Sequence, residues 1–358
     1  MTRLILVWIF IFIHLIAYPQ LTVNDLKNSE TYIIHPNALK WDNKSLPFKN
    51  VVVIDNRFDT SKLGYIKDSR KYEKLNLTNG LPGTMQQVIH STLQNNMDAS
   101  SNSSLYIFIN HLWIQPTTEM EFSKQKLYKP DINNDTNYVS CNATLESFIH
   151  KDDFFYPLLR TDSLFLVKGK VSEKSNEIIS LPFQFLLNEL NKLDLKRQRK
   201  PVESNVLLKH YEERLAFPRM KTDILEKGVY LNYQDFLNNR ISNPSFTIKY
   251  KNRGRVRYIF DEKEQELLHN IWGYCNGEKL YVKVGPNYYE LTRENYSYEL
   301  IGSKDLIRYN SVSGVGPQSS NPAFMLSKDL FSEMTLQNNL NPKNIRPLQL
   351  NMETGEPY

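Results

Sequence analysis

Apolar residues in the first half of the chain alternate between the spacing of strands and the spacing of helices. The apolar run 51–54 ends in Asp55, which is the pattern of a buried strand that opens into a polar loop. Residues 85–93 carry apolar side chains every three or four positions and follow Pro82, so a helix is predicted there. The segment 105–114 is apolar at both alternating positions, as expected of a central strand covered on both faces.

The middle of the chain predicts a hairpin, a further strand and two helices around an exposed charged stretch. In chain order these are the hairpin strands 145–149 and 154–159, the strand 164–171, the helix 183–193, the charged stretch 196–201 and the helix 202–215.

Beyond Gly228 the pattern changes to aromatic residues and turn signals. The strands predicted there cover 246–250, 255–260, 279–284, 288–291 and 296–301, with a short helix at 265–270 after the capping-box spacing of Asp261 and Glu264.

These elements predict an α+β protein in which an N-terminal mixed sheet with packed helices precedes a smaller, mostly-β domain. The predicted divisions are a signal peptide over 1–20, an N-terminal α+β domain over 21–200, a C-terminal domain with a leading helix over 201–310, and a tail over 311–358. The tail is rich in Ser, Asn, Gln and Pro, so it is predicted to be largely mobile, although Leu348–Leu350 is apolar.

The N-terminus has the pattern of an export signal. Arg3 precedes an apolar run of 15 residues from Leu4 to Tyr18, whereas a bilayer crossing needs about 20. The alternative is an uncleaved anchor, because residues 17–20 match a small-residue cleavage site poorly. No other segment approaches this length, so the mature chain is predicted to lack a transmembrane span and to be periplasmic, outer-membrane-associated or extracellular.

The net charge and the absence of known motifs argue against several classes of function. The chain has 44 Lys and Arg against 39 Asp and Glu, a net charge of +5, which is too weak for a dedicated nucleic-acid binder of this size. The glycine-rich nucleotide motifs, the His-Glu-x-x-His zinc motif and the Gly-x-Ser-x-Gly nucleophile motif are absent from the sequence. No cofactor and no catalytic residue are therefore predicted.

Three sets of residues are candidates for a site. Asp131, Asn133, Asp135 and Asn137 resemble the first ligands of a calcium loop, but Thr136 and Asn142 replace its glycine and bidentate glutamate, so a polar loop is the preferred interpretation. Asp55, Arg57 and Asp59 follow a strand at the edge where α/β sheets bind ligands, and a loop salt bridge is the preferred alternative. Cys141 and Cys275 form either a disulfide or two buried thiols.

A further, fourth set is a basic stripe. Lys249, Lys251, Arg253, Arg255 and Arg257 alternate with other residues, so a continuous strand would place five cations on one face. Such a stripe could hold an anionic lipid or polymer. If residues 252–254 form a turn, the stripe divides between two strands of a hairpin. The preferred interpretation is that these cations discourage edge-to-edge strand pairing.

The C-terminal part resembles a known group. The strings Gly228–Phe236, Asn243–Ser245, Ile271–Gly277 and Leu280–Val282 are similar to a pattern in uncharacterised exported proteins of Bacteroidota-type bacteria. The resemblance covers residues 225–305 and implies a bacterial envelope setting without any catalytic residue. The N-terminal half is similar, in element order alone, to envelope domains of outer-membrane assembly and transport-accessory lipoproteins.

Two functions are compatible with these patterns. The first is an exported cell-envelope protein that binds or assembles an envelope protein, or an anionic surface polymer or lipid, without catalysis. The second is a secreted or periplasmic hydrolase whose dispersed acidic residues meet only in the fold. Converging carboxylates of perturbed pKa in a deep cleft would favour the hydrolase.

Overall fold

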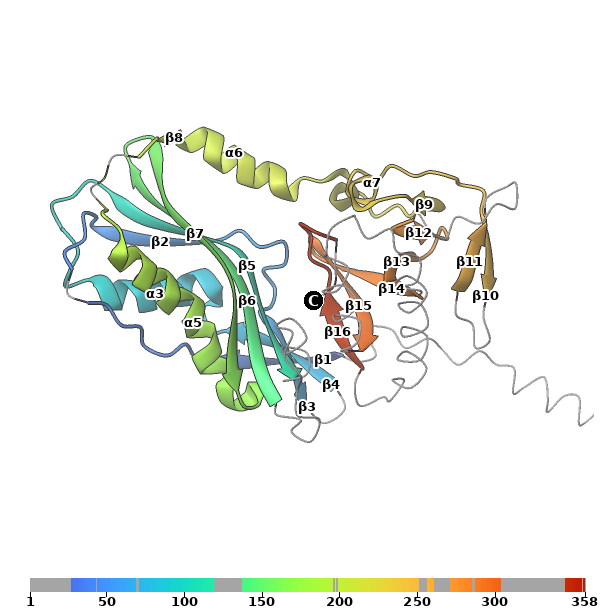
Figure 1. The fold of residues 1–358 in the computed structure, drawn as a ribbon, viewed down its shortest axis with the longest axis horizontal. Coiled ribbons are helices and arrows are strands. Elements are labelled where there is room, and N and C mark those ends of the chain that lie inside the picture. The colour runs from blue at the N-terminus through green and yellow to red at the C-terminus, as the bar shows by residue number, and fades with distance from the viewer. Residues whose placement is uncertain are drawn as a thin grey trace, which may run out of the picture.

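The computed structural model describes residues 27–42, 44–68, 71–118, 137–195, 197, 199–250, 256–260, 271–284, 287–303, 345–355 and 357. Two β-sheets dominate this part of the chain, and helix α6 (Ser204–Leu215) runs from the first sheet toward the second (Figure 1). The α+β class predicted from the sequence is confirmed. Among the described residues, no helix combines the length and the apolar content needed to cross a membrane. The predicted leader 1–20 and the predicted helix 265–270 lie outside the described residues.

The N-terminal sheet is mixed. Its neighbouring strands follow the order β1-β4-β3-β5-β6-β7-β8, and β2, which is outside this order, pairs with β5. Its strands are β1 (Lys27–Ile34), β2 (Asn50–Asp55), β3 (Gly64–Asp68), β4 (Lys71–Leu77), β5 (Ser104–Thr118), β6 (Asn137–Lys151), β7 (Phe154–Lys168) and β8 (Val202–Glu203). β1 with β4, β2 with β5 and β3 with β5 are parallel pairs, and the other pairs are antiparallel.

β5 lies at the centre of this sheet, as its apolar pattern predicts. One edge of β5 pairs with β2 along Ser104–Ile109 and meets β3 only where Gly64 lies opposite Ile114. Gly64 has a φ of +149°, and a Cβ atom there would lie 1.9 Å from the Ile114 carbonyl oxygen. A glycine is therefore required at this crossing of the two chains.

Two helices cover one face of the N-terminal sheet. Helix α3 (Gly80–Leu93) lies against β2, and helix α5 (Val171–Lys192) lies against β6 and β7 (Figure 1). The buried residues of α3 recur at four-residue spacing, which confirms the predicted apolar stripe. Helix α5 begins at Val171 rather than near Phe183, because its first turns also pack on the sheet through Val171 and Ile178.

β6 and β7 form the predicted hairpin, but its strands are much longer than expected. Asp152 adopts a φ of +55° in the turn, a left-handed conformation that Asp tolerates better than most residues. The predicted strand 164–171 is present up to Lys168, but it is the end of β7 and not a separate strand. β7 continues without a break to Lys168, and Gly169 then leads into α5.

The C-terminal sheet is antiparallel throughout, with the order β16-β15-β14-β13-β12-β9. Its strands are β9 (Gly228–Tyr230), β12 (Gly273–Cys275), β13 (Leu280–Val284), β14 (Asn287–Glu294), β15 (Ser297–Ser303) and β16 (Ile345–Gln349). The 3-10 helix η2 (Pro218–Lys221), helix α7 (Tyr233–Leu237) and a hairpin of β10 (Thr247–Tyr250) and β11 (Val256–Phe260) complete this half.

The end of the tail belongs to the C-terminal sheet. Residues 311–344 lie outside the described residues, but β16 pairs with β15 from Ile345 to Gln349. Leu348 and Leu350 are fully buried in the core cluster that also contains Tyr230, Phe236 and Leu300. The prediction of a largely mobile tail is therefore wrong for residues 345–355, where the apolar positions supply a core strand.

Helix α6 lies over the uncovered face of the N-terminal sheet. Tyr211 stacks on Phe108 of β5 with ring centroids 4.5 Å apart, in a cluster that includes Phe148 and Phe155. The helix begins at Ser204, two residues later than predicted, because Val202 and Glu203 pair with β7 as β8.

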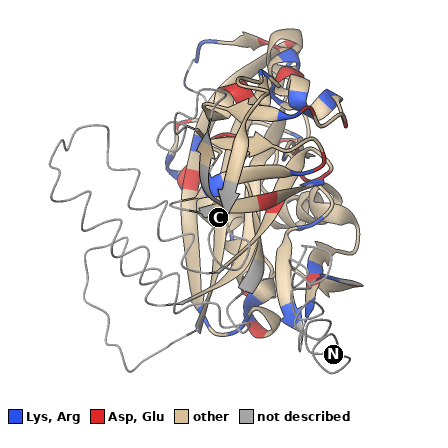
Figure 2. Ribbon diagram, turned by 90° about the vertical axis from the view of Figure 1, so that its right-hand side faces the viewer, with Lys and Arg blue, Asp and Glu red and all other residues tan. Residues whose placement is uncertain are grey.

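Lys and Arg are interspersed with Asp and Glu over the described ribbon (Figure 2).

Candidate functional site

Asp55 and Arg57 form a buried ion pair at the end of β2. The Arg57 guanidinium donates to both Asp55 carboxylate oxygens, at 2.8 and 2.7 Å, and the two side chains are 5% and 7% exposed. Arg57 also donates to the backbone carbonyls of Lys62 and Leu112. The pair therefore fixes the loop after β2 against β5, as the alternative of a loop salt bridge predicts.

Asp59, two residues further on, belongs to a different cluster of charged side chains. Lys62 forms ion pairs with Asp59 and, at 2.8 Å, with Glu299 of β15. The side chains of all three residues are fully buried. Because Lys62 comes from the N-terminal half and Glu299 from the C-terminal sheet, this ion pair joins the two halves of the molecule.

The same cluster extends to the first strand. Lys27 of β1 forms ion pairs with Glu294 at 2.5 Å and with Glu299 at 2.6 Å. The Tyr65 hydroxyl of β3 donates to the Glu299 carboxylate, 2.8 and 3.0 Å from its two oxygens. We call Lys27, Asp59, Lys62, Tyr65, Glu294 and Glu299 the junction cluster.

The charges of the junction cluster nearly balance. Two lysines face three carboxylates, which leaves one excess negative charge. Burial acts to raise the pKa of Asp59, but the adjacent Lys62 charge and hydrogen bonds hold that pKa below its ordinary value. Burial acts to lower the pKa of Lys62, but Glu299 and Asp59 raise it above its ordinary value. Burial and the Glu299 charge raise the pKa of Tyr65.

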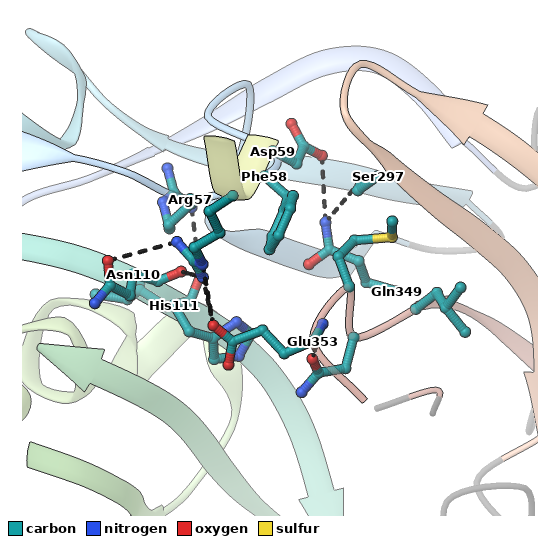
Figure 3. Close-up of a pocket in the computed structure, with 13 residues that line it drawn as sticks. Arg57, Phe58, Asp59, Asn110, His111, Ser297, Gln349 and Glu353 are labelled. Carbon is teal, nitrogen blue, oxygen red and sulfur yellow. Dashed lines mark hydrogen bonds and ion pairs between the residues drawn. The ribbon is translucent and has the colours of Figure 1, made fainter. Parts of the chain in front are cut away.

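A small pocket lies beside this cluster, between the two sheets (Figure 3). It is lined by residues 57–59 and 110–112, by Arg214 of α6, by Ser297 and by residues 349–353. Figure 3 shows Gln349 between Asp59 and Ser297, and its amide nitrogen lies 3.4 Å from the Asp59 carboxylate. The pocket has a volume of about 20 Å³, which is room for about one water molecule.

Arg214 joins three parts of the chain at the rim of the pocket. Its guanidinium donates to the carbonyls of Asn56 at 2.8 Å and Asn110 at 3.0 Å, and to the Glu353 carboxylate at 2.7 Å. It also lies over the Phe58 ring, 4.7 Å from the ring centroid. Burial and the charges of Arg57 and Arg214 lower the pKa of His111 to about 3, so this imidazole is neutral at physiological pH.

The charged groups in and beside the pocket bond one another across elements that are distant in the sequence. The space between them has room for about one water molecule. Within the described residues, no three His, Cys, Asp or Glu side chains lie together in an arrangement that could hold a metal ion.

The remaining candidates do not join this site. Asp131, Asn133 and Asp135 of the calcium-like string lie outside the described residues, and Asn137 is the first residue of β6. Cys141 and Cys275 are buried free thiols in different hydrophobic cores, so the disulfide is not formed. Burial raises the pKa of both thiols.

The basic stripe is divided between two strands. β10 and β11 pair antiparallel, with Lys249 opposite Tyr258, so Lys249 and Arg257 do not share one continuous strand. Lys251, Arg253 and Arg255 lie outside the described residues. The described residues of the stripe therefore do not lie on one continuous strand, and their pairing fits the alternative of a hairpin.

Sequence reasoning missed most of the residues that build the junction. Lys62 lies in a polar loop without any periodic pattern, and Glu353 lies in the stretch predicted to be mobile. Glu299 alternates with Tyr298 and Leu300, which predicts a solvent-facing position for the carboxylate. Asp59 is the residue of the junction cluster that the sequence did indicate, because it follows a strand close to Asp55 and Arg57.

We compared the chain with protein-family models and with curated proteins, and neither comparison found a match. The resemblance over residues 225–305 to exported proteins of Bacteroidota-type bacteria stays a prediction. That segment contributes β9, α7 and strands β12 to β15, and so forms most of the C-terminal sheet.

Proposed function

We propose that this chain is an exported cell-envelope protein that binds or assembles a partner protein without catalysing a reaction on it. The observation that carries the proposal is the junction between the two sheets. The titratable groups gathered there bond to one another, and the pocket beside them has room for about one water. Such a joint fixes the relative position of the two halves, which suits a binding or assembly role.

A hydrolase is supported less well, although one observation favours it. Asp59, Glu294 and Glu299 come from distant segments and converge, as a site assembled only in the fold requires. However, two lysines form ion pairs with these carboxylates, and Asp59 has a lowered pKa, whereas a general acid needs a raised one.

Helix α6 is the element whose exposed surface best fits a protein partner. Tyr211 and Arg214 anchor the helix on the N-terminal sheet, whereas the apolar side chains of Val206 and Leu208 are 55% and 42% exposed. Phe154, which pairs with Glu203 just before the helix, is 37% exposed. Exposed apolar side chains gathered on one element are typical of protein-binding surfaces.

The test places a photo-crosslinking amino acid at Leu208 in the native host and analyses the envelope fraction. The matched control carries the same amino acid at Glu278, an exposed turn residue of the C-terminal sheet. We expect one discrete protein adduct at position 208 and none at position 278. Sequencing the N-terminus of the recovered chain shows in the same sample whether the leader is removed.

Two other outcomes would contradict this proposal. A chain that forms no adduct at Leu208, but cleaves polysaccharides or peptides and loses that activity in an Asp59→Asn variant, would establish the hydrolase. An adduct formed equally at both positions would mean that α6 is not the binding surface.

A further inference from the structure

β7 forms an edge of the N-terminal sheet that is largely open in the described part of the chain. β6 pairs with one side of β7 from Phe154 to Lys168, whereas β8 covers only Phe154 and Phe155 on the other side. A bulge near Leu158 interrupts the pairing, and from Leu159 onward the strand is regular. The regular end of β7 therefore presents a row of backbone donors and acceptors at the edge.

Apolar side chains flank this edge on both faces of the sheet. Leu164 is 44% exposed on the face away from α5. On the other face Phe165 packs against Phe185 of α5 with ring centroids 5.8 Å apart, and Phe185 is 36% exposed. An added strand would place its alternating side chains against both apolar borders.

Two opposite charges mark the ends of the apolar stretch. Asp162 and Lys168 are exposed and share the face of Leu164, because they stand at even spacing from it. Neither makes an ion pair with another residue in the described part of the chain. The stretch therefore begins with an unpaired anion and ends with an unpaired cation.

We propose that β7 pairs antiparallel with β7 of a second copy of this chain, around a two-fold axis at Phe165. In this register Asp162 lies opposite Lys168 of the other copy, and the reverse pair forms at the other end. Leu164 then lies opposite Leu166, and the two Phe165 residues meet at the axis. The N-terminal sheets of both copies become one continuous sheet through a self-complementary contact.

Charge selects this register over its neighbours. A two-fold axis at Leu164 would place Arg160 opposite Lys168 and so oppose like charges. An axis at Leu166 would place Leu164 opposite Lys168 and leave Asp162 opposite Lys170 beyond the strand end. The end of β7 at Lys168 limits this register to residues 162–168, and Pro157 and the bulge near Leu158 lie outside it. This surface is separate from α6, so the inference does not depend on the proposed function.

Reversing each charge tests both the edge and the register. Sedimentation of the purified protein is expected to show a reversible monomer–dimer equilibrium. Asp162→Lys or Lys168→Asp alone replaces two attractive cross-strand pairs with two repulsive ones, which is expected to raise the dimer Kd about tenfold or more. An equal mixture of the two variants restores opposite charges in both pairs, so heterodimers are expected to form with close to the original Kd.

The control is Lys209→Asp, which changes the net charge by the same amount on a side chain of α6 that is 73% exposed. It is expected to leave the dimer Kd unchanged. Circular dichroism and thermal unfolding check that each variant is folded, and recovery in the mixture is itself evidence that both are. A protein that stays monomeric at all concentrations, or a dimer whose Kd the charge reversals do not change, would overturn the proposal.

Discussion

Lys62 is the side chain on which the charge balance of the junction depends most. It is fully buried and contacts both Asp59 and Glu299, so its removal leaves two buried carboxylates without that cation. Removing one partner of a buried ion pair costs about 3–5 kcal/mol. We therefore expect Lys62→Met to lower the free energy of unfolding by about that amount at neutral pH. Lys209→Met, on the exposed face of α6, serves as the control and is expected to change little.

The same substitution is expected to reverse the acid dependence of stability. In the wild-type chain Asp59 has a folded pKa below its ordinary 3.8, so its contribution is present above that pH and is lost as the pH falls through the folded pKa. Lys62 has a folded pKa above 10.5, so its contribution is present below that pH and is lost as the pH rises through the folded value.

Without Lys62, the balance at Asp59 changes sign. Burial, no longer opposed by the Lys62 charge, then raises the pKa of Asp59, so the folded state binds more protons than the unfolded state. Stability of Lys62→Met is expected to rise as the pH is lowered from neutral toward about 5. Urea unfolding at a series of pH values measures this slope. A Lys62→Met profile parallel to the wild-type profile would show that Lys62 does not set the charge state of its partners.

At the scale of single elements, Gly64 decides whether β3 can cross β5. Gly64→Ala places a Cβ atom against the Ile114 carbonyl oxygen at a positive φ, and backbone strain of this kind costs about 1–3 kcal/mol. Gly83→Ala in α3 is the matched control, because its Cβ would meet only Asn79 at 3.6 Å. We expect the control to be neutral or to stabilise by up to about 1 kcal/mol. Equal stability of both variants in thermal unfolding would contradict the requirement for glycine at position 64.

The sequence predicts elements whose apolar side chains pack locally. The four-residue spacing of Met85, Ile89 and Leu93 identifies α3, and the double apolar alternation identifies β5. The junction could not be predicted in the same way. Glu299 alternates with apolar neighbours and has a solvent-facing pattern, and only contact with Lys62 and Tyr65, more than two hundred residues earlier in the chain, makes it a buried residue.

At the scale of the whole molecule, the junction makes the two sheets depend on each other. Phe58, from the loop after β2, packs in the core of the C-terminal sheet. Arg214 links that loop to Glu353 near the end of the chain, and Glu299 accepts bonds from Lys27, Lys62 and Tyr65. Unfolding of either sheet therefore exposes charged groups of the other, and the two should unfold together.

Single-tryptophan variants can measure this coupling. Trp113 lies buried in the N-terminal sheet, and Trp272 packs against Phe236 at the C-terminal sheet. With the other tryptophans replaced by Phe, we expect both probes to give the same urea midpoint in the otherwise unchanged chain. Adding Arg214→Met and Glu299→Gln is expected to separate the midpoints, because the bonds across the junction are lost. Arg160→Met, which removes a surface pair with Glu146, should leave them coincident. Midpoints that already differ without these substitutions would mean that the junction positions the two sheets without coupling their stability.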